Sequence, residues 1–308
     1  MLRRLGGASQ VQGGRGVKLF GREIAIRRKG CCFDGEPGTE LVPSVTLYVK
    51  VTNACPCACP FCSNAEHAGE DEGFDLQKLL QVVREIKLSG LELTRVCVTG
   101  GEPSAAVDRV LPLLEALSDF EFKDVRLQLN TNGISRRARD LMRHPRWTLV
   151  AMSMHHYDLA MLGEIYGVRD PIEPFDLKDI GEDRLYLNCN LVRGYVDSTD
   201  KVMRLLAFAE TLGAGEVGFE TLRQVNAFCR ERFVGIDSLD VESRDHVHRL
   251  AERTRGNACH CRNYLFAGRE SNMRFYLREL CDYSSSESTL LYDGRFLCQG
   301  FGAKSVIC

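Results

Sequence analysis

Three cysteines share one short segment of the chain. Cys55, Cys59 and Cys62 are spaced Cys-x3-Cys-x2-Cys, directly after a short β-rich apolar run. Three thiolates on one loop can each bind one iron of a cubane iron–sulfur cluster and leave the fourth iron without a protein ligand. Chemistry can occur at that open iron. Cys57 keeps an alternative open, because Cys57, Cys59 and Cys62 with a distant fourth ligand would suit zinc.

A second motif follows the next strand-like segment. Gly100, Gly101, Glu102 and Pro103 come directly after residues 95–99. Glycine lets the backbone approach a ligand closely, a glutamate accepts from an ammonium group, and proline fixes the exit of the turn. Such a turn alone is more typical of a tight connection between a strand and a helix. At the same sheet edge as the cysteines, it predicts a site that holds an amino acid.

Both motifs follow predicted strands, and the chain repeats this strand pattern six times. The predicted strands are residues 46–51, 95–99, 125–130, 148–154, 185–192 and 216–221. Amphipathic helical segments alternate with them, which is the pattern of βα units and a parallel sheet. The clearest helix spans residues 75–89, with Asp75 as its predicted N-cap and Gly90 as its end. Pro112 predicts a kink or a later start for the helix expected at 105–117.

The composition is that of a soluble globular protein. The 308 residues include 40 Lys and Arg against 42 Asp and Glu, a formal net charge of −2. The molecule as a whole therefore has no electrostatic preference for nucleic acid or for an anionic membrane. No apolar run approaches the roughly 20 residues that cross a bilayer, and the N-terminus lacks the apolar middle of a signal peptide. We expect a cytoplasmic protein without a membrane partner, and we do not expect a nucleic-acid partner.

The chain has 14 cysteines and no recognisable export signal. In a reducing cytosol this content favours metal or cluster ligation over a disulfide framework. Cys97, Cys189 and Cys229 stand singly in strand-like or helical sequence, and we predict that they are small buried hydrophobic residues.

Three regions are predicted along the chain. Residues 1–42 form a basic, glycine-rich arm, whose first 30 residues carry eight basic side chains against one acid, a charge of about +7. Its glycines suit a mobile arm or a short hairpin, which could dock an acidic partner or be a solvated lead-in. Residues 43–235 hold the βα units. Residues 236–308 form a separate C-terminal region in which the cysteines return.

Together these residues resemble the radical S-adenosylmethionine (SAM) superfamily, over roughly residues 43–225. The cysteine triad matches the cluster ligands of that family, and the glycine turn matches its Gly-Gly-Glu motif. Further matches are Phe61 before the third cysteine, Thr131 and Asn132 in a "TNG" strand end, Ser153 at the position of a ribose-contacting serine, and Asn190 and Arg193 in an "N-x-V-x-x-R-G" segment. The last segment resembles the branch that contains the molybdenum-cofactor cyclase and the SPASM/twitch peptide maturases.

The resemblance implies a partial (β/α)6 TIM-like barrel that holds a [4Fe–4S] cluster and SAM at the carboxyl ends of its strands. Cys55, Cys59 and Cys62 would ligate the cluster. The SAM contacts would come from Phe61, Gly100, Gly101, Glu102, Pro103, Thr131, Asn132, Ser153, Asn190 and Arg193. A reduced cluster would pass one electron to SAM and release a 5′-deoxyadenosyl radical, which takes a hydrogen atom from the substrate. The electron donor would be of the flavodoxin or ferredoxin type.

Two histidines follow the fourth predicted strand. In an alternating strand, one of His155 and His156 should face the barrel mouth and the other should lean away. A histidine that faces the substrate could orient it or move a proton. A packing or capping role at the strand end is an equal alternative.

The C-terminal cysteines predict a second metal site. Cys259, Cys261, Cys281 and Cys298 are the candidate ligands, and the stretch from Cys281 reads Cys-x12-Gly-x3-Cys. This resembles the start of a SPASM or twitch region, one residue shorter than the family's usual spacing. We expect one additional iron–sulfur cluster held by a subset of these residues, with a structural zinc or free thiols as alternatives.

The predicted function is therefore a radical SAM enzyme that abstracts a hydrogen atom from a peptide or from a small metabolite. Peptide modification comes first, because the basic arm could hold an acidic leader segment and the C-terminal cysteines are SPASM-like. A small-molecule biosynthetic enzyme is the closest alternative. An RNA-modifying enzyme and a non-catalytic zinc or iron–sulfur module are the remaining ones.

Overall fold

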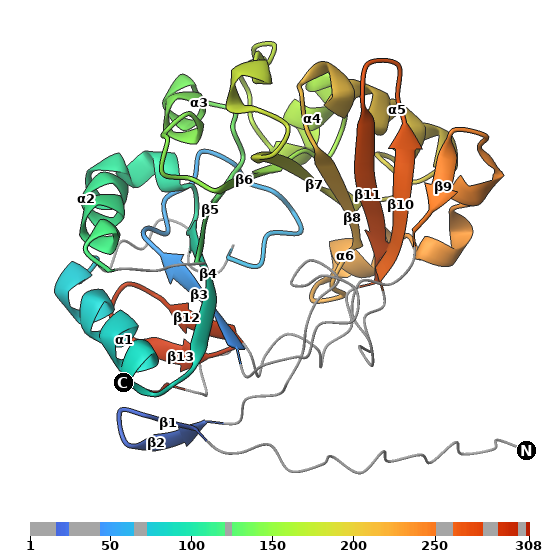
Figure 1. Cartoon of the computed structure of the whole chain (residues 1–308). Helices are drawn as coiled ribbons and strands as arrows, with labels where there is room; N and C mark the ends of the chain where they lie inside the picture. Colours follow the sequence, from blue (N-terminus) through green and yellow to red (C-terminus); the bar gives the residue numbers. More distant parts are fainter. Residues whose placement is uncertain are drawn as a thin grey trace, which may run out of the picture.

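A computed structural model describes residues 17–24, 44–64, 73–120, 125–250, 261–279, 289–300 and 306–308. Within these ranges, 11 strands form one sheet in the order β13-β12-β3-β4-β5-β6-β7-β8-β11-β10-β9. The sheet is strongly curved, and the long helices lie on its outer side (Figure 1).

The centre of the sheet consists of six neighbouring strands that all run parallel. They are β3 (Ser44–Lys50), β4 (Glu92–Thr99), β5 (Arg126–Thr131), β6 (Leu149–Ser153), β7 (Leu185–Leu191) and β8 (Glu216–Thr221). Each of the six predicted strands is present, and the predicted TIM-like partial barrel is confirmed. Parallel strands end at one common edge, so the segments that follow β3 and β4 come together there.

Strands from beyond residue 235 extend the sheet at both edges. Next to β3 lie β12 (Thr289–Tyr292), which is parallel to it, and β13 (Leu297–Gln299). Next to β8 lie β11 (Asn272–Arg278), again parallel, then β10 (Cys261–Ala267) and β9 (Val247–Arg249). The described strands of the C-terminal region therefore belong to the same sheet as the core.

Of the α-helices that the structure describes, all except α2 begin at a side-chain cap. In α1 (Leu76–Leu88), the Asp75 carboxylate accepts from the backbone N–H of Lys78, as the sequence predicts. Pro112 lies inside α2 (Val107–Ser118), whose α-helical part starts after the 3-10 turn η2 (Pro103–Ala106). The other helices are α3 (Arg136–Met142), α4 (Leu159–Tyr166), α5 (Thr199–Thr211) and α6 (Ala227–Glu231), with 3-10 turns η3 (Lys178–Ile180), η4 (Ile236–Ser238) and η5 (Val241–Ser243).

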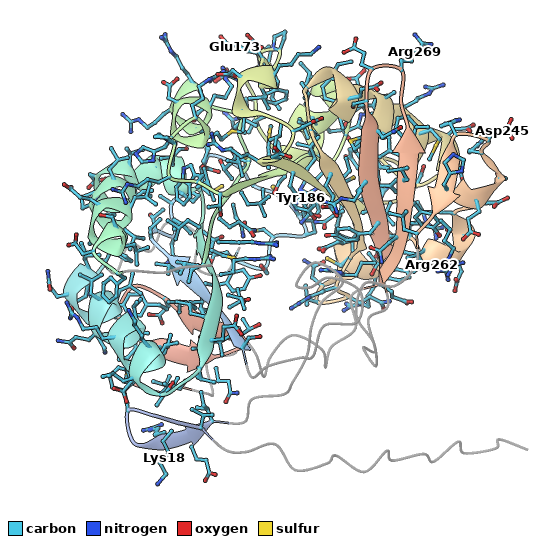
Figure 2. All side chains as sticks on the ribbon, in the orientation of Figure 1. Lys18, Glu173, Tyr186, Asp245, Arg262 and Arg269 are labelled. Atoms are coloured by element: carbon cyan, nitrogen blue, oxygen red, sulfur yellow. The ribbon has the colours of Figure 1, made fainter. Side chains whose placement is uncertain are left out.

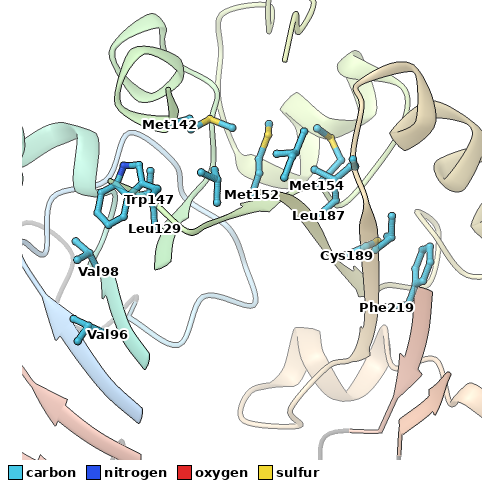
Figure 3. Close-up of a cluster of buried hydrophobic side chains, with 14 of the residues drawn as sticks. Val96, Val98, Leu129, Met142, Trp147, Met152, Met154, Leu187, Cys189 and Phe219 are labelled. Atoms are coloured by element: carbon cyan, nitrogen blue, oxygen red, sulfur yellow. The ribbon is translucent and has the colours of Figure 1, made fainter. Parts of the chain in front are cut away.

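Apolar side chains on alternate strand positions fill the layer between sheet and helices. Figure 3 shows Val98, Leu187, Cys189 and Phe219 in this layer, and all four are fully buried. Because successive strand residues point to opposite faces, the residues between them line the inner, concave face. The prediction that Cys97, Cys189 and Cys229 are buried is also confirmed.

The described part of the N-terminal arm is a short hairpin, one of the two forms expected for it. It pairs β1 (Val17–Leu19) with β2 (Arg22–Ile24). The backbone N–H of Phe20 donates to Glu85 on α1 at 3.1 Å, which holds the hairpin against that helix. Among the residues that the structure describes, none of the helices has both the length and the apolar character that crossing a bilayer requires.

Candidate active site

The cysteine loop, residues 51–64, starts where β3 ends. Its four thiols are free: those of Cys55 and Cys62 belong to exposed residues, and Cys57 and Cys59 are half-buried. A backbone N–H two residues further on donates to the sulfur of Cys55 and to that of Cys62, each at 3.4 Å. The loop thus presents thiol sulfurs together with nearby amide donors.

The glycine turn after β4 is fastened to the start of the cysteine loop. The backbone N–H of Gly101 donates to the carbonyl oxygen of Thr52 at 2.7 Å, and that of Glu102 donates to Ala54 at 2.8 Å. A Cβ atom on Gly100 or on Gly101 would collide with the loop backbone. The sequence predicts that these glycines open the backbone to a ligand; in the structure they also let the two loops meet.

Glu102 connects the glycine turn to the end of β5. Its side chain is 1% exposed. One carboxylate oxygen accepts from the Ser104 N–H at 3.1 Å and from the Thr131 hydroxyl at 2.7 Å, and the other accepts from the Asn132 N–H at 2.8 Å. Burial raises the pKa of Glu102, and these hydrogen bonds oppose that shift. Thr131 and Glu102 therefore hold each other in place.

The Asn132 side chain contacts the sulfurs of the loop. Its Nδ2 donates to Cys57 Sγ at 3.3 Å and lies 3.9 Å from Cys55 Sγ. A hydrogen bond with the Cys57 thiol lowers the pKa of Cys55 to about 7, against the effect of burial, and Asn132 adds to the decrease. The pKa of Cys57 is raised by its contacts with Cys55 and Cys59. The contacts with Cys57 and Asn132 thus favour the thiolate form of Cys55, which is the form that binds metal.

The far side of the cysteine loop is held by the end of α4. The backbone N–H of Ala58 donates to the carbonyl oxygen of Tyr166 at 2.7 Å, and the Tyr166 hydroxyl donates to the carbonyl oxygen of Ser153 at 2.5 Å. Gly167 ends the helix with φ = +66° and lies against Ala58. Sequence reasoning missed this support, although the Tyr-Gly helix end was visible as a possible C-cap.

A second support comes from α6. The side chain of Asn226 caps this helix by accepting from the Cys229 N–H at 2.8 Å, and its Nδ2 donates to the carbonyl oxygen of Pro60 at 2.9 Å. The ring of Phe228 on the same helix lies 6.5 Å from that of Phe61. Asn226 was not among the predicted site residues, because an N-cap gives no sign in the sequence of a second partner 166 residues away.

Phe61 packs on His155 at the end of β6. The two rings meet edge to face with centroids 4.9 Å apart, and Tyr166 covers His155 from another side at 5.6 Å. His155 Nδ1 accepts from the backbone N–H of Asn190 at 3.0 Å. Burial lowers the pKa of His155 to about 3, so its imidazole is neutral. His155 thus makes the packing contacts that were one of its two predicted roles.

His156 makes the contacts of a local cap. Its Nδ1 accepts from the Asp158 N–H at 2.9 Å, and its ring stacks on Tyr157 with centroids 4.4 Å apart. His156 is as buried as His155.

The other predicted site residues lie at different distances from the loop. Pro103 is buried at the start of η2, and Ser153 and Asn190 lie half-buried at the carboxyl ends of β6 and β7. Arg193 is exposed, and its guanidinium donates to the carbonyl oxygen of Phe233 at 3.4 Å. The structure thus brings the glycine turn, Thr131, Asn132 and Phe61 to the cysteine loop, whereas Arg193 contacts a neighbouring loop.

The predicted C-terminal metal site lies largely outside the described residues. Cys259 and Cys281 fall outside them, and Cys261 is described only as part of the β10 backbone. Cys298 is buried in β13, at the opposite edge of the strand order from β10. Within the described ranges, no three His, Cys, Asp or Glu side chains are arranged to hold a single metal ion. The second cluster stays a prediction.

The residues of the cysteine loop fit a cubane iron–sulfur cluster. Such a cluster needs thiolates that each bind a different iron, so they need not converge on one point. Cys55, Cys59 and Cys62 supply three soft sulfur donors on one loop that is fastened at both ends. They are the residues that would hold the cluster.

Comparison with known proteins agrees with this site. The family model described as "Radical SAM superfamily" matches residues 49–206. That match covers half of the chain and includes both the cysteine loop and the glycine turn. No curated protein sequence matches the chain.

Two solved structures resemble part of this chain. The SAM-bound SuiB of Streptococcus suis is 18% identical, with a TM-score of 0.48, over 60% of this chain and 42% of SuiB. A radical SAM methyltransferase from Sphaerobacter thermophilus is 15% identical, with a TM-score of 0.47, over 63% of this chain and 60% of its own length. The match therefore spans about two fifths of SuiB.

The fold, the cysteine loop and the family match together define the class of the protein: this chain belongs to the radical SAM superfamily. Membership of this superfamily implies SAM and a [4Fe–4S] cluster as cofactors.

Proposed function

We propose that the chain cleaves SAM reductively at a [4Fe–4S] cluster ligated by Cys55, Cys59 and Cys62, and that a hydrogen atom is then abstracted from a peptide or a small metabolite. The observation that supports this most is the pair of backbone hydrogen bonds between the cysteine loop and the glycine turn. Through them, the candidate cluster ligands lie beside the motif that in this family binds the amino group of SAM.

When bound, the two cofactors together supply a one-electron cleavage of the C5′–S bond of SAM and a radical that takes the hydrogen atom. The side chains of the protein would hold the two cofactors in position. Glu102 and Asn132 fix the turn and the β5 end against the loop, and Phe61 offers an aromatic surface for the adenine, held in orientation by His155. His155 is neutral and its Nδ1 is occupied by the Asn190 N–H, so its proposed part is to position Phe61 rather than to move a proton.

Two classes of substrate are proposed, and the sequence favours the first. A peptide comes first, because an arm of charge about +7 could hold an acidic leader segment. A small metabolite comes second. A flavodoxin-type or ferredoxin-type donor would deliver the electron.

Anaerobic reconstitution with iron and sulfide tests the proposal. We expect a brown protein that absorbs near ~400 nm and converts SAM to 5′-deoxyadenosine and methionine when dithionite is added. Cys59→Ala should remove both properties. Cys57→Ala is the matched control: it lies two residues away in the same loop and should keep the cluster.

Two results would contradict this assignment. If Cys59→Ala kept the absorbance and SAM cleavage, the cluster ligands would have to be sought elsewhere. If Cys57→Ala lost its metal and the wild-type protein contained zinc without iron, the zinc alternative at Cys57, Cys59 and Cys62 would replace the cluster.

A further inference from the structure

Strands β7, β8 and β11 carry a group of polar side chains on the inner face of the sheet. This inner polar cluster consists of Tyr186, Asn188, Asn190, Glu220, Tyr276 and Arg278. Figure 2 shows Tyr186 on the concave side, away from the helices. The strand register places Asn190, Glu220 and Arg278 in one row, and Asn188, Gly218 and Tyr276 in the row below.

The cluster is connected by hydrogen bonds. Arg278 Nη1 donates to Glu220 Oε1 at 3.0 Å, and the Tyr276 hydroxyl donates to the same oxygen at 3.3 Å. The hydroxyls of Tyr186 and Tyr276 are 2.5 Å apart, and their rings are stacked with centroids 6.4 Å apart. A Cβ atom on Gly218 would collide with both hydroxyls, so the glycine makes room for them.

The cluster lies at the same end of the sheet as the cysteine loop. Arg278 is the last residue of β11 and Glu220 the last but one of β8, and both strands run parallel to β3. The Arg278 and Glu220 side chains keep 24% and 15% of their surface exposed, so the ion pair is reachable from the concave side. The charges of both residues act on Tyr48 of β3, whose pKa burial raises. The cluster therefore faces the strand that leads into the cysteine loop.

The inner face also holds acceptors that nothing in the described chain satisfies. Asn188 Oδ1 is buried without a hydrogen-bond donor, and the same is true of Gln128 Oε1 on β5. Leaving a buried acceptor unpaired costs about 1–3 kcal/mol in general, so native proteins rarely keep one without a purpose. An N–H group of a bound molecule would satisfy Asn188.

We propose that the inner polar cluster binds the α-carboxylate and the α-N–H of an amino-acid unit of the substrate. This rests on the proposed function. Arg278 recognises the carboxylate through its planar guanidinium, and Asn188 Oδ1 and Glu220 accept from the N–H. A free amino acid and the C-terminal residue of a peptide share this chemistry, whereas an internal peptide residue lacks the carboxylate.

Deuterium transfer and binding test the proposal with three sets of compounds. The first set is a mixture of perdeuterated free amino acids. The second contains the N-acetyl derivatives of these amino acids, and the third contains their N-acetyl methylamides, which have no carboxylate. The reconstituted full chain is incubated with SAM and dithionite, and the deuterium content of 5′-deoxyadenosine is measured by mass spectrometry. Equilibrium dialysis of the same mixtures against the SAM-bound protein without reductant measures binding independently of SAM cleavage.

We expect one deuterium atom to move to the 5′ carbon from a compound that carries the carboxylate, and none from the methylamides. Transfer from the free amino acids alone identifies a free amino acid as the substrate unit. Transfer from the N-acetyl derivatives identifies a C-terminal peptide residue.

Variants test whether the inner polar cluster is the group that binds the carboxylate. Arg278→Gln should reduce both retention in dialysis and deuterium transfer about tenfold or more, because a charge-assisted contact is lost. The double variant Glu220→Gln/Arg278→Gln removes both charges of this ion pair together, and it should lose binding equally while keeping the fold and the iron–sulfur absorbance. Arg274→Gln, on the same strand with 52% of its side chain exposed, is the matched control and should behave as wild type.

The proposal is overturned if the methylamides bind and transfer deuterium as well as the acids do. It is also overturned if abundant 5′-deoxyadenosine forms with no deuterium from any mixture, or if Arg278→Gln binds the acids as wild type does. If the protein forms no 5′-deoxyadenosine, the proposed function is contradicted instead. The dialysis result then still decides whether the inner polar cluster binds an amino-acid unit.

Discussion

Glu102 donates its backbone N–H to the carbonyl oxygen of Ala54 at 2.8 Å, and so joins the turn after β4 to the loop after β3. The same residue, through its buried carboxylate, accepts from the backbone N–H of Asn132 at the end of β5. One residue thus fixes three neighbouring strand ends relative to each other. The cysteine loop is therefore a pre-positioned part of the sheet edge, and its tethers can be tested separately.

Gly101→Ala should destabilise the protein and its cluster together. The added Cβ would lie 2.5 Å from the carbonyl oxygen of Asn53 and still closer to Ala54, and backbone atoms cannot turn away. Overpacking of this kind costs about 1–3 kcal/mol in free energy of unfolding. Urea unfolding and the iron content after reconstitution measure the two effects. Gly163→Ala in α4 is the control, because its Cβ would lie 3.6 Å from Val168; a loss of iron in that variant equal to that of Gly101→Ala would contradict the explanation.

Asn226→Asp should weaken the cluster without weakening the helix. Aspartate keeps the oxygen that accepts from the Cys229 N–H but has no Nδ2 to donate to Pro60. We expect an unfolding free energy within about 0.5 kcal/mol of wild type and a faster loss of the ~400 nm absorbance under air. Ser135→Ala, which removes the cap of α3, should cost about 1 kcal/mol and leave the rate of cluster loss unchanged. An Asn226→Asp protein with the wild-type rate would show that the Pro60 contact is dispensable.

His155 should make the stability depend on pH in the acid range. Burial lowers its pKa from 6.5 to about 3, so between these values the unfolded chain binds one more proton than the folded chain. The contribution of neutral His155 to the free energy of unfolding is fully present above about pH 6.5, and it is lost as the pH falls toward 3. Between pH 6.5 and 4.5 the loss should be about 2–3 kcal/mol. His155→Asn keeps an acceptor for the Asn190 N–H but does not titrate. The unfolding free energy of the wild type should therefore fall more steeply with decreasing pH than that of the variant. Equal pH profiles in urea unfolding would contradict the buried neutral state.

Much of the core could be predicted from the sequence because its signals are local. The alternation of β8 and the apolar stripe of α1 are each contained in a single element, and both elements are present. The strands after residue 235 were harder, since β11 and β12 find their partners in β8 and β3 across long stretches of chain. Nothing in either segment indicates which edge of the sheet it will join.

The amino-acid sequence by itself determined the cysteine triad, the glycine turn and the six parallel strands, because spacing and hydrophobic period are properties of neighbouring residues. The tertiary structure alone decided why the two glycines are needed, which residues hold the loop from behind, and that Glu220 and Arg278 meet on the inner face. Such contacts join residues from tens of positions to 166 positions apart, and only the pairing and curvature of the strands bring them within hydrogen-bond distance.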